Sequence, residues 1–171
     1  MSKTRQITLM AMMLVFALMV SYIERYIPPP IPMLPGIKVG LANIVVLLLL
    51  YLWGYRYALS LNILRILLSG LLFTGVWGAV YALSGAVFSF ISMALLKRSR
   101  LFGVVGVSVI GGAAHNLGQL CVAALATATG GLFYYLPVLI VSGVITGVLV
   151  GYLAGLLIQR IHKHVGTSSG A

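Results

Sequence analysis

Acidic residues are almost absent from this chain of 171 residues. Its eleven Lys and Arg residues face a single acid, Glu24, so the formal net charge is +10. Enzymes that activate phosphates through Mg²⁺ normally hold the metal with several carboxylates. The chain cannot build such a site alone, and most of its basic side chains have no carboxylate partner within it.

Cysteine and the motifs of common catalytic sites are scarce as well. Cys121 is the only cysteine, and no Cys/His spacing resembles a zinc site. No GxxxxGK[ST] loop is present, so the chain cannot hydrolyse ATP by that route. Its basic residues lie between apolar runs, whereas a nucleic-acid-binding protein gathers them on a solvated face. We therefore expect no enzyme activity, metal, cofactor or nucleic-acid partner.

Apolar residues are abundant. They make up 61% of the chain, charged residues make up 7%, and the mean hydropathy is +1.14. This composition is typical of an integral membrane protein. Apolar segments near the length that crosses a ~30 Å hydrocarbon core occur at residues 6–26, 38–53, 56–73, 76–96, 102–128 and 134–161.

These segments predict an all-α integral membrane protein, a compact bundle of six transmembrane helices. Residues 1–165 would form one domain and residues 166–171 a flexible tail. Cytoplasmic flanks of spans retain Lys and Arg, and with six spans only Arg25 and Lys38 fall on the outer side. We therefore expect both termini in the cytoplasm, together with Lys3, Arg5, Arg56, Lys97, Arg98, Arg100, Arg160 and Lys163.

A four-residue glycine ladder runs along the last segment. Glycines at this spacing share one helical face and let a neighbouring backbone approach closely. We expect helix packing to be the role of Gly143, Gly147, Gly151 and Gly155.

Arg65 lies midway along an apolar segment and needs an explanation. An arginine at that depth costs about 2.5 to more than 10 kcal/mol, so it usually faces a partner, a cavity or a ligand. Asn62 and Ser69 share its helical face at i−3 and i+4. Each of these groups needs an internal partner, because hydrocarbon offers none.

Other polar residues have depths that allow them to converge with Arg65 on one outward-facing cavity, between the first, second, third and fifth helices. Unpaired cations around such a cavity favour an anionic ligand. In the alternative interpretation, the groups form a structural network in which Glu24 neutralises Arg65 or Lys38. The predicted substrate-binding residues are Arg65, Lys38, Asn43, His115, Asn116, Gln119, Glu24 and Asn62.

Four stretches carry a family resemblance: Pro35-Gly-Ile-Lys-Val-Gly-Leu-Ala-Asn43, Leu64-Arg-Ile-Leu-Leu-Ser-Gly70, Gly111-Gly-Ala-Ala-His-Asn-Leu-Gly-Gln119 and Leu136-Pro-Val-Leu-Ile-Val-Ser-Gly143. Together they resemble the Gx transporter family, also labelled heptaprenyl diphosphate synthase component I, over residues from about 5 to 162. More distantly, the chain is similar to the S components of energy-coupling factor (ECF) transporters.

The resemblance implies a six-helix protein of the bacterial cytoplasmic membrane that captures a small molecule from outside. Such a subunit works with a membrane T subunit and two cytoplasmic ATPases. The loop between its first two helices gates the pocket, which here implicates Pro28, Pro32, Pro35 and Gly36. Docking on the T subunit would use Ala11 and Ala17, which are six residues apart where the family often has alanines four apart.

Two functions follow as alternatives. The first is a substrate-binding subunit of an uptake transporter, with a pocket for a small anionic solute of the vitamin or isoprenoid and quinone precursor class. The second is a non-catalytic membrane accessory subunit of heptaprenyl diphosphate synthase, which would recruit a soluble prenyl diphosphate synthase through Lys97, Arg98 and Arg100. Membrane lipid is a partner in both. A third possibility, a scaffold without a ligand, predicts that the central polar groups bond to one another and leave no cavity.

Overall fold

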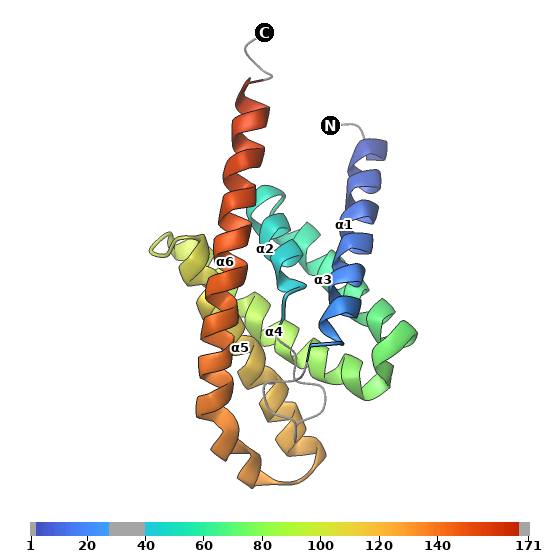
Figure 1. Ribbon diagram of the computed structural model, residues 1–171, viewed down its shortest axis with the longest axis vertical. Coiled ribbons are helices and arrows are strands. Elements are labelled where there is room, and N and C mark those ends of the chain that lie inside the picture. Colours follow the sequence, from blue (N-terminus) through green and yellow to red (C-terminus); the bar gives the residue numbers. More distant parts are fainter. Residues whose placement is uncertain (1–2, 28–39, 168–171) are drawn as a thin grey trace.

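The computed structural model describes residues 3–27 and 40–167, and side chains as far as residue 163 (Figure 1). The predicted gating residues Pro28, Pro32, Pro35 and Gly36, together with Lys38 and residues 168–171, lie outside this part of the chain. The described part forms helices and no strand. The α-helices are α1 (Lys3–Glu24), α2 (Asn43–Leu52), α3 (Tyr55–Ser69), α4 (Gly75–Ser99), α5 (Val104–Ala126) and α6 (Leu136–Thr167).

Among the described residues, four helical segments are long and apolar enough to cross a membrane: Lys3–Glu24, Tyr55–Ser99, Val104–Ala126 and Gly130–Lys163. The all-α class is therefore confirmed for this part of the chain, whereas six separate crossings stay a prediction. The difference has two causes. The segment Tyr55–Ser99 contains both α3 and α4, which the sequence predicts as separate spans, and the helix α2 is short. It has 10 residues and rises about 15 Å, half the thickness of the hydrocarbon core.

The short helix α2 lies in the core of the bundle. Every residue from Val45 to Leu50 is buried, as expected for a helix that is apolar on all sides. Gly40 and Gly54 have φ of +83° and +93° on either side of it. These left-handed conformations, which favour glycine, turn the chain before and after the helix.

The helices α3 and α4 meet at a corner. A π-helical turn, η1 (Gly70–Thr74), follows α3, and Gly75 with φ +72° ends it. A methyl group added at Gly70 would lie 2.7 Å from Cβ of Ala79, so the chain folds back closely on itself. The break expected near residues 74–75 is confirmed, but the two segments continue each other without a loop.

The helices α4, α5 and α6 pack at small residues. A methyl group at Gly118 would lie 2.7 Å from the carbonyl oxygen of Ser84 in α4. On the other side of α5, a methyl group at Gly147 of α6 would lie 2.6 Å from Cα of Val109. Gly143 and Gly151 also face the α5 backbone, whereas Gly155 has open space around it. The close contact thus covers three of the four ladder positions.

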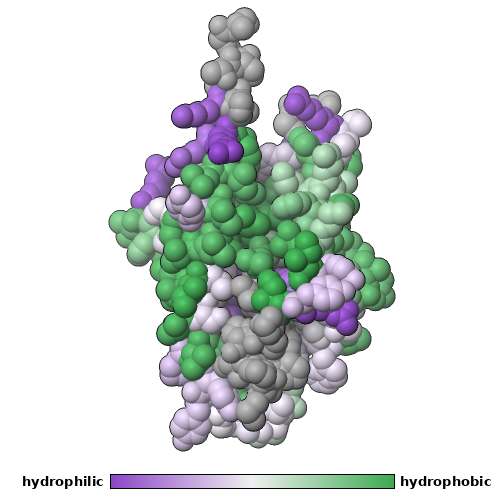
Figure 2. Space-filling model, viewed as in Figure 1, coloured by the Kyte–Doolittle hydropathy of each residue, from purple (hydrophilic) through white to green (hydrophobic). Residues whose placement is uncertain are grey.

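A short 3₁₀ helix, η2 (Gly130–Tyr135), joins α5 to α6. The beginning of α1 and the end of α6 lie at the same end of the molecule (Figure 1). A chain that crosses a membrane an even number of times begins and ends on the same side, as this arrangement allows. Figure 2 shows hydrophilic residues at both of these ends and a broad hydrophobic surface below them. That surface includes exposed apolar side chains of α1 and α6, as a lipid-facing surface would.

Candidate functional site

Arg65 is buried where α1 and α3 meet, and only 8% of its surface is exposed. Its Nη2 donates to Asn62 Oδ1 at 2.8 Å, one helical turn earlier on α3. Its Nη1 donates to Ser21 Oγ on α1 at 3.0 Å. The third nitrogen, Nε, is buried and has no hydrogen-bond partner in the described structure. The guanidinium is therefore held largely by neutral oxygen atoms.

Glu24, the last residue of α1, connects this arginine to the start of α2. Its carboxylate interacts electrostatically with Arg65. Its Oε1 also accepts hydrogen bonds from the backbone N–H groups of Gly40 and Leu41, the latter at 3.3 Å. These N–H groups lie just before α2, where a negative charge is favourable for the helix. One carboxylate thus joins α1, the beginning of α2 and α3.

His115 and Gln119 lie elsewhere, at the contact between α5 and α4. A methyl group at Gly85 of α4 would lie 2.8 Å from the His115 ring and 2.9 Å from Gln119 Cγ. The His115 Nδ1 atom faces the Gly85 backbone without a well-formed hydrogen bond. The ring is also within electrostatic range of Arg65.

Asn116 faces the opposite side of α5. Its Nδ2 donates to the carbonyl oxygen of Leu139 at 2.7 Å, so its amide joins α5 to α6. This carbonyl is in the first turn of α6. The contact is the kind that polar side chains make between membrane helices.

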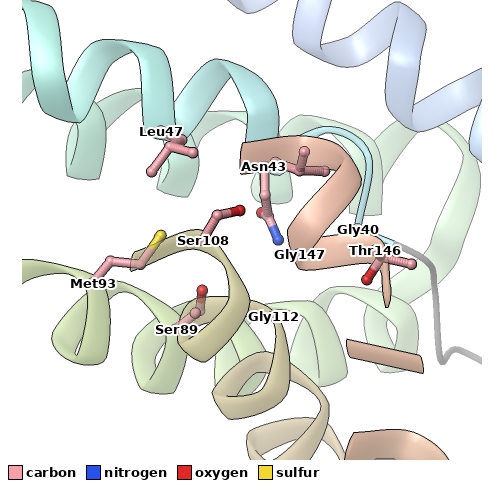
Figure 3. Close-up of a pocket in the computed structure, with 11 residues that line it drawn as sticks. Gly40, Asn43, Leu47, Ser89, Met93, Ser108, Gly112, Thr146 and Gly147 are labelled. Carbon is pink, nitrogen blue, oxygen red and sulfur yellow. The ribbon is translucent and has the colours of Figure 1, made fainter. Parts of the chain in front are cut away.

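A small pocket lies among α2, α4, α5 and α6. Its enclosed part holds about 20 Å³, space for roughly one water molecule. Figure 3 shows the Asn43 amide and the Ser108 hydroxyl pointing toward each other, with the Ser89 hydroxyl directed into the same space. The lining also includes Gly40, Leu47, Met93, Gly111, Gly112, Thr146, Gly147 and Val150.

One feature of the pocket indicates binding. Ser89 is 3% exposed, and its Oγ has no hydrogen-bond partner among the described residues. A buried hydroxyl left in this state costs about 1–3 kcal/mol, so a water molecule or ligand atom normally satisfies it.

The structure thus divides the described site residues among four places. Arg65, Asn62 and Glu24 form one network, His115 and Gln119 lie on the α4 side of α5, and Asn116 contacts α6. Only Asn43 of the described candidates lines the pocket. Sequence reasoning missed Ser89 and Thr146, because single hydroxyl residues in apolar helices give little signal.

The two alanines expected to dock a T subunit have different surroundings. Ala17 is fully buried in the hydrophobic core, whereas Ala11 is exposed on α1. They therefore do not form one exposed stripe. In the described part of the chain, no group of three His, Cys, Asp or Glu side chains could hold a metal ion.

Comparison with protein families gives one match, heptaprenyl diphosphate synthase component I, over residues 13–157. Searches of curated proteins and of solved structures find no match. The family match confirms the resemblance that the four sequence stretches indicate. The family's description names one component of a synthase, and it says nothing of catalytic residues. The chain belongs to the heptaprenyl diphosphate synthase component I family.

Proposed function

We propose that the chain is a membrane solute-binding subunit of an uptake transporter, and that the pocket among α2, α4, α5 and α6 receives part of the solute. The buried, unpartnered Ser89 hydroxyl carries this proposal. Asn43, Ser108 and Thr146 add an amide and two hydroxyls around the same space. Such groups suit a solute with hydrogen-bonding oxygen atoms, including those of a carboxylate or phosphate.

In this proposal, Arg65 acts on the pocket from a distance. Glu24 holds the N–H groups of Gly40 and Leu41, and Gly40 contacts Asn43, since a methyl group there would lie 3.1 Å from Asn43 Nδ2. Arg65 balances the charge of Glu24. Arg65 and Glu24 would therefore be positioning residues that fix the α2 wall of the pocket.

The pocket must enlarge to admit anything bigger than water. Met93 is the lining side chain best suited to move, because methionine has three flexible side-chain torsions. It lies against α5, where a methyl group at Gly111 would be 2.6 Å from its Cγ. We propose that solute entry turns this side chain away from the pocket.

Native mass spectrometry of the purified chain with a panel of water-soluble vitamins and short prenyl diphosphates tests the proposal. One member of the panel should bind, and Ser89→Ala should weaken its binding. Ser92→Ala is the matched control, because Ser92 Oγ already donates to the Phe88 carbonyl at 2.8 Å. Equal loss in both variants, or no binding to the wild type, would argue against the pocket.

We also propose six crossings with both termini in the cytoplasm, in the cytoplasmic membrane of a bacterium. The beginning of α1 and the end of α6 lie at one end of the molecule, which supports an even number of crossings. Energy for uptake would come from a T subunit and cytoplasmic ATPases, because the chain itself has no nucleotide-binding loop.

The second candidate is a non-catalytic accessory subunit of heptaprenyl diphosphate synthase. The family description favours it directly. Arg98 and Arg100 are exposed where α4 ends and would contact a soluble prenyl diphosphate synthase. Lys97 is less available, because its Nζ donates to the carbonyl oxygen of Leu50.

Affinity purification from the native membrane separates the two candidates. Recovery of a T subunit with ATPases supports transport, whereas recovery of a prenyl synthase supports the accessory role. If a prenyl synthase is recovered, Arg98→Gln with Arg100→Gln should release it from the chain.

A further inference from the structure

A second hollow lies between α1 and α3. It has a volume of about 410 Å³, within the range of ligand sites. Its wall on α1 is formed by Ile7, Met10, Ala11 and Leu14, which share one helical face, and its wall on α3 includes Leu61 and Leu64. We call this hollow the α1–α3 groove. It shares no lining residue with the pocket among α2, α4, α5 and α6.

One end of the groove is polar and positively charged. Gln6 Nε2 donates to Tyr57 Oη at 3.2 Å, which brings the first turns of α1 and α3 together. Lys3 lies about one turn before Gln6 and Arg56 is next to Tyr57, and both are exposed. The only acid of the chain, Glu24, lies 18 residues beyond Gln6, about 27 Å along α1. Lys3 and Arg56 therefore lie within about one helical turn of the Gln6–Tyr57 contact, which is far along α1 from the carboxylate of Glu24.

An apolar groove with a cationic mouth is complementary to an amphiphile with an anionic head. We propose that the α1–α3 groove binds an acyl chain of an anionic phospholipid, whose phosphate lies between Lys3 and Arg56. These residues are at the end of the molecule where basic residues gather, and such ends usually face the anionic lipids of the cytoplasmic leaflet.

Native mass spectrometry tests how far the two basic residues contribute to lipid binding. The full chain is released from detergent with either phosphatidylglycerol or phosphatidylcholine, and the two lipids have identical acyl chains. We expect about tenfold higher occupancy by phosphatidylglycerol, because each basic residue near the surface favours an anionic lipid several-fold. Lys3→Gln with Arg56→Gln should abolish this preference. Arg98→Gln with Arg160→Gln removes two exposed basic residues at other helices and should preserve it.

A second pair of variants tests the apolar part. Ala11→Trp fills the groove and should remove the bound lipid, whereas Ile145→Trp, at a 64% exposed position of α6, should not. Equal occupancy by the two lipids in the wild type would overturn the proposal, as would a preference that survives loss of Lys3 and Arg56. If heptaprenyl diphosphate displaces phosphatidylglycerol, the groove is a site for the prenyl diphosphate instead. If a protein displaces the lipid from the wild type but does not bind the Ala11→Trp variant, the groove is a protein-docking site.

Discussion

Glu24 and Arg65 are the residues on which the meeting of three helices depends. The arginine is buried with Ser21 and Asn62. The carboxylate interacts electrostatically with the arginine and accepts hydrogen bonds from the backbone before α2. Removing one member of a buried charge pair leaves the other without compensation, which is more costly than removing both.

Glu24→Gln should therefore lower stability by about 3–5 kcal/mol, the cost of an uncompensated buried charge. The thermal midpoint of the purified protein measures the effect. The double variant Glu24→Gln with Arg65→Gln should be less destabilised than the sum of the two single variants. Additive losses would show that the two side chains act independently.

Ser89→Ala should separate binding from stability. The change removes a buried hydroxyl that has no partner, so the thermal midpoint of the solute-free protein should stay the same or rise. Affinity for the bound solute should fall about tenfold, the value of one lost hydrogen bond of about 1.4 kcal/mol. A lower midpoint with unchanged affinity would make Ser89 a structural residue.

At this scale the sequence could predict which residues are unusual but not which of them meet. The sequence shows the single carboxylate, Glu24, and the arginine within an apolar segment, Arg65. It also shows that Arg65 and Lys38 are two possible partners of Glu24. The backbone N–H groups of Gly40 and Leu41 are not visible in this way, because any residue supplies such donors.

At the scale of helices, the contact between α5 and α6 depends on residues without side chains. Methyl groups at Gly112 or Gly147 would meet backbone atoms of the facing helix, which cannot move aside as a flexible side chain can. Gly147→Ala should therefore lower the thermal midpoint strongly, as overpacking of a core does by about 1–3 kcal/mol. Gly155→Ala is the control, because nothing lies within 4 Å of a methyl group there. Equal effects would show that backbone approach is unimportant.

The end of α2 depends on Lys97. Its Nζ donates to the Leu50 carbonyl and lies 5.0 Å from the ring centres of both Tyr51 and Tyr55. A lysine at this position satisfies a carbonyl that the helix end leaves free. Lys97→Met should destabilise the fold by about 1–3 kcal/mol, measured by thermal unfolding, whereas Arg98→Met should have little effect. If both substitutions have only a small effect, Lys97 does not stabilise the end of α2.

The positions of the helices could be predicted from apolar runs and from breaks at Gly and Pro, but their lengths could not. The segment at 38–53 predicts a span, whereas the described α2 has 10 residues and is buried by its neighbours. Hydropathy does not distinguish burial in protein from burial in lipid, because both environments select the same side chains.

At the scale of the whole molecule, orientation is the property that distinguishes an outward-facing pocket from an inward-facing one. We expect the α4–α5 connection on the cytoplasmic side and the α5–α6 connection outside. In a Cys121→Ser background, a membrane-impermeant maleimide should label Thr129→Cys in intact cells and label Ser99→Cys only after lysis. The reverse pattern would contradict the proposed orientation.

The proposed pocket is tested by an experimental structure of the purified chain with the solute that mass spectrometry identifies. We predict solute density among α2, α4 and α5, within hydrogen-bonding distance of Ser89 Oγ, and Arg65 still bound to Ser21 and Asn62. Density against the Arg65 guanidinium, or an empty pocket at saturating solute, would contradict this prediction.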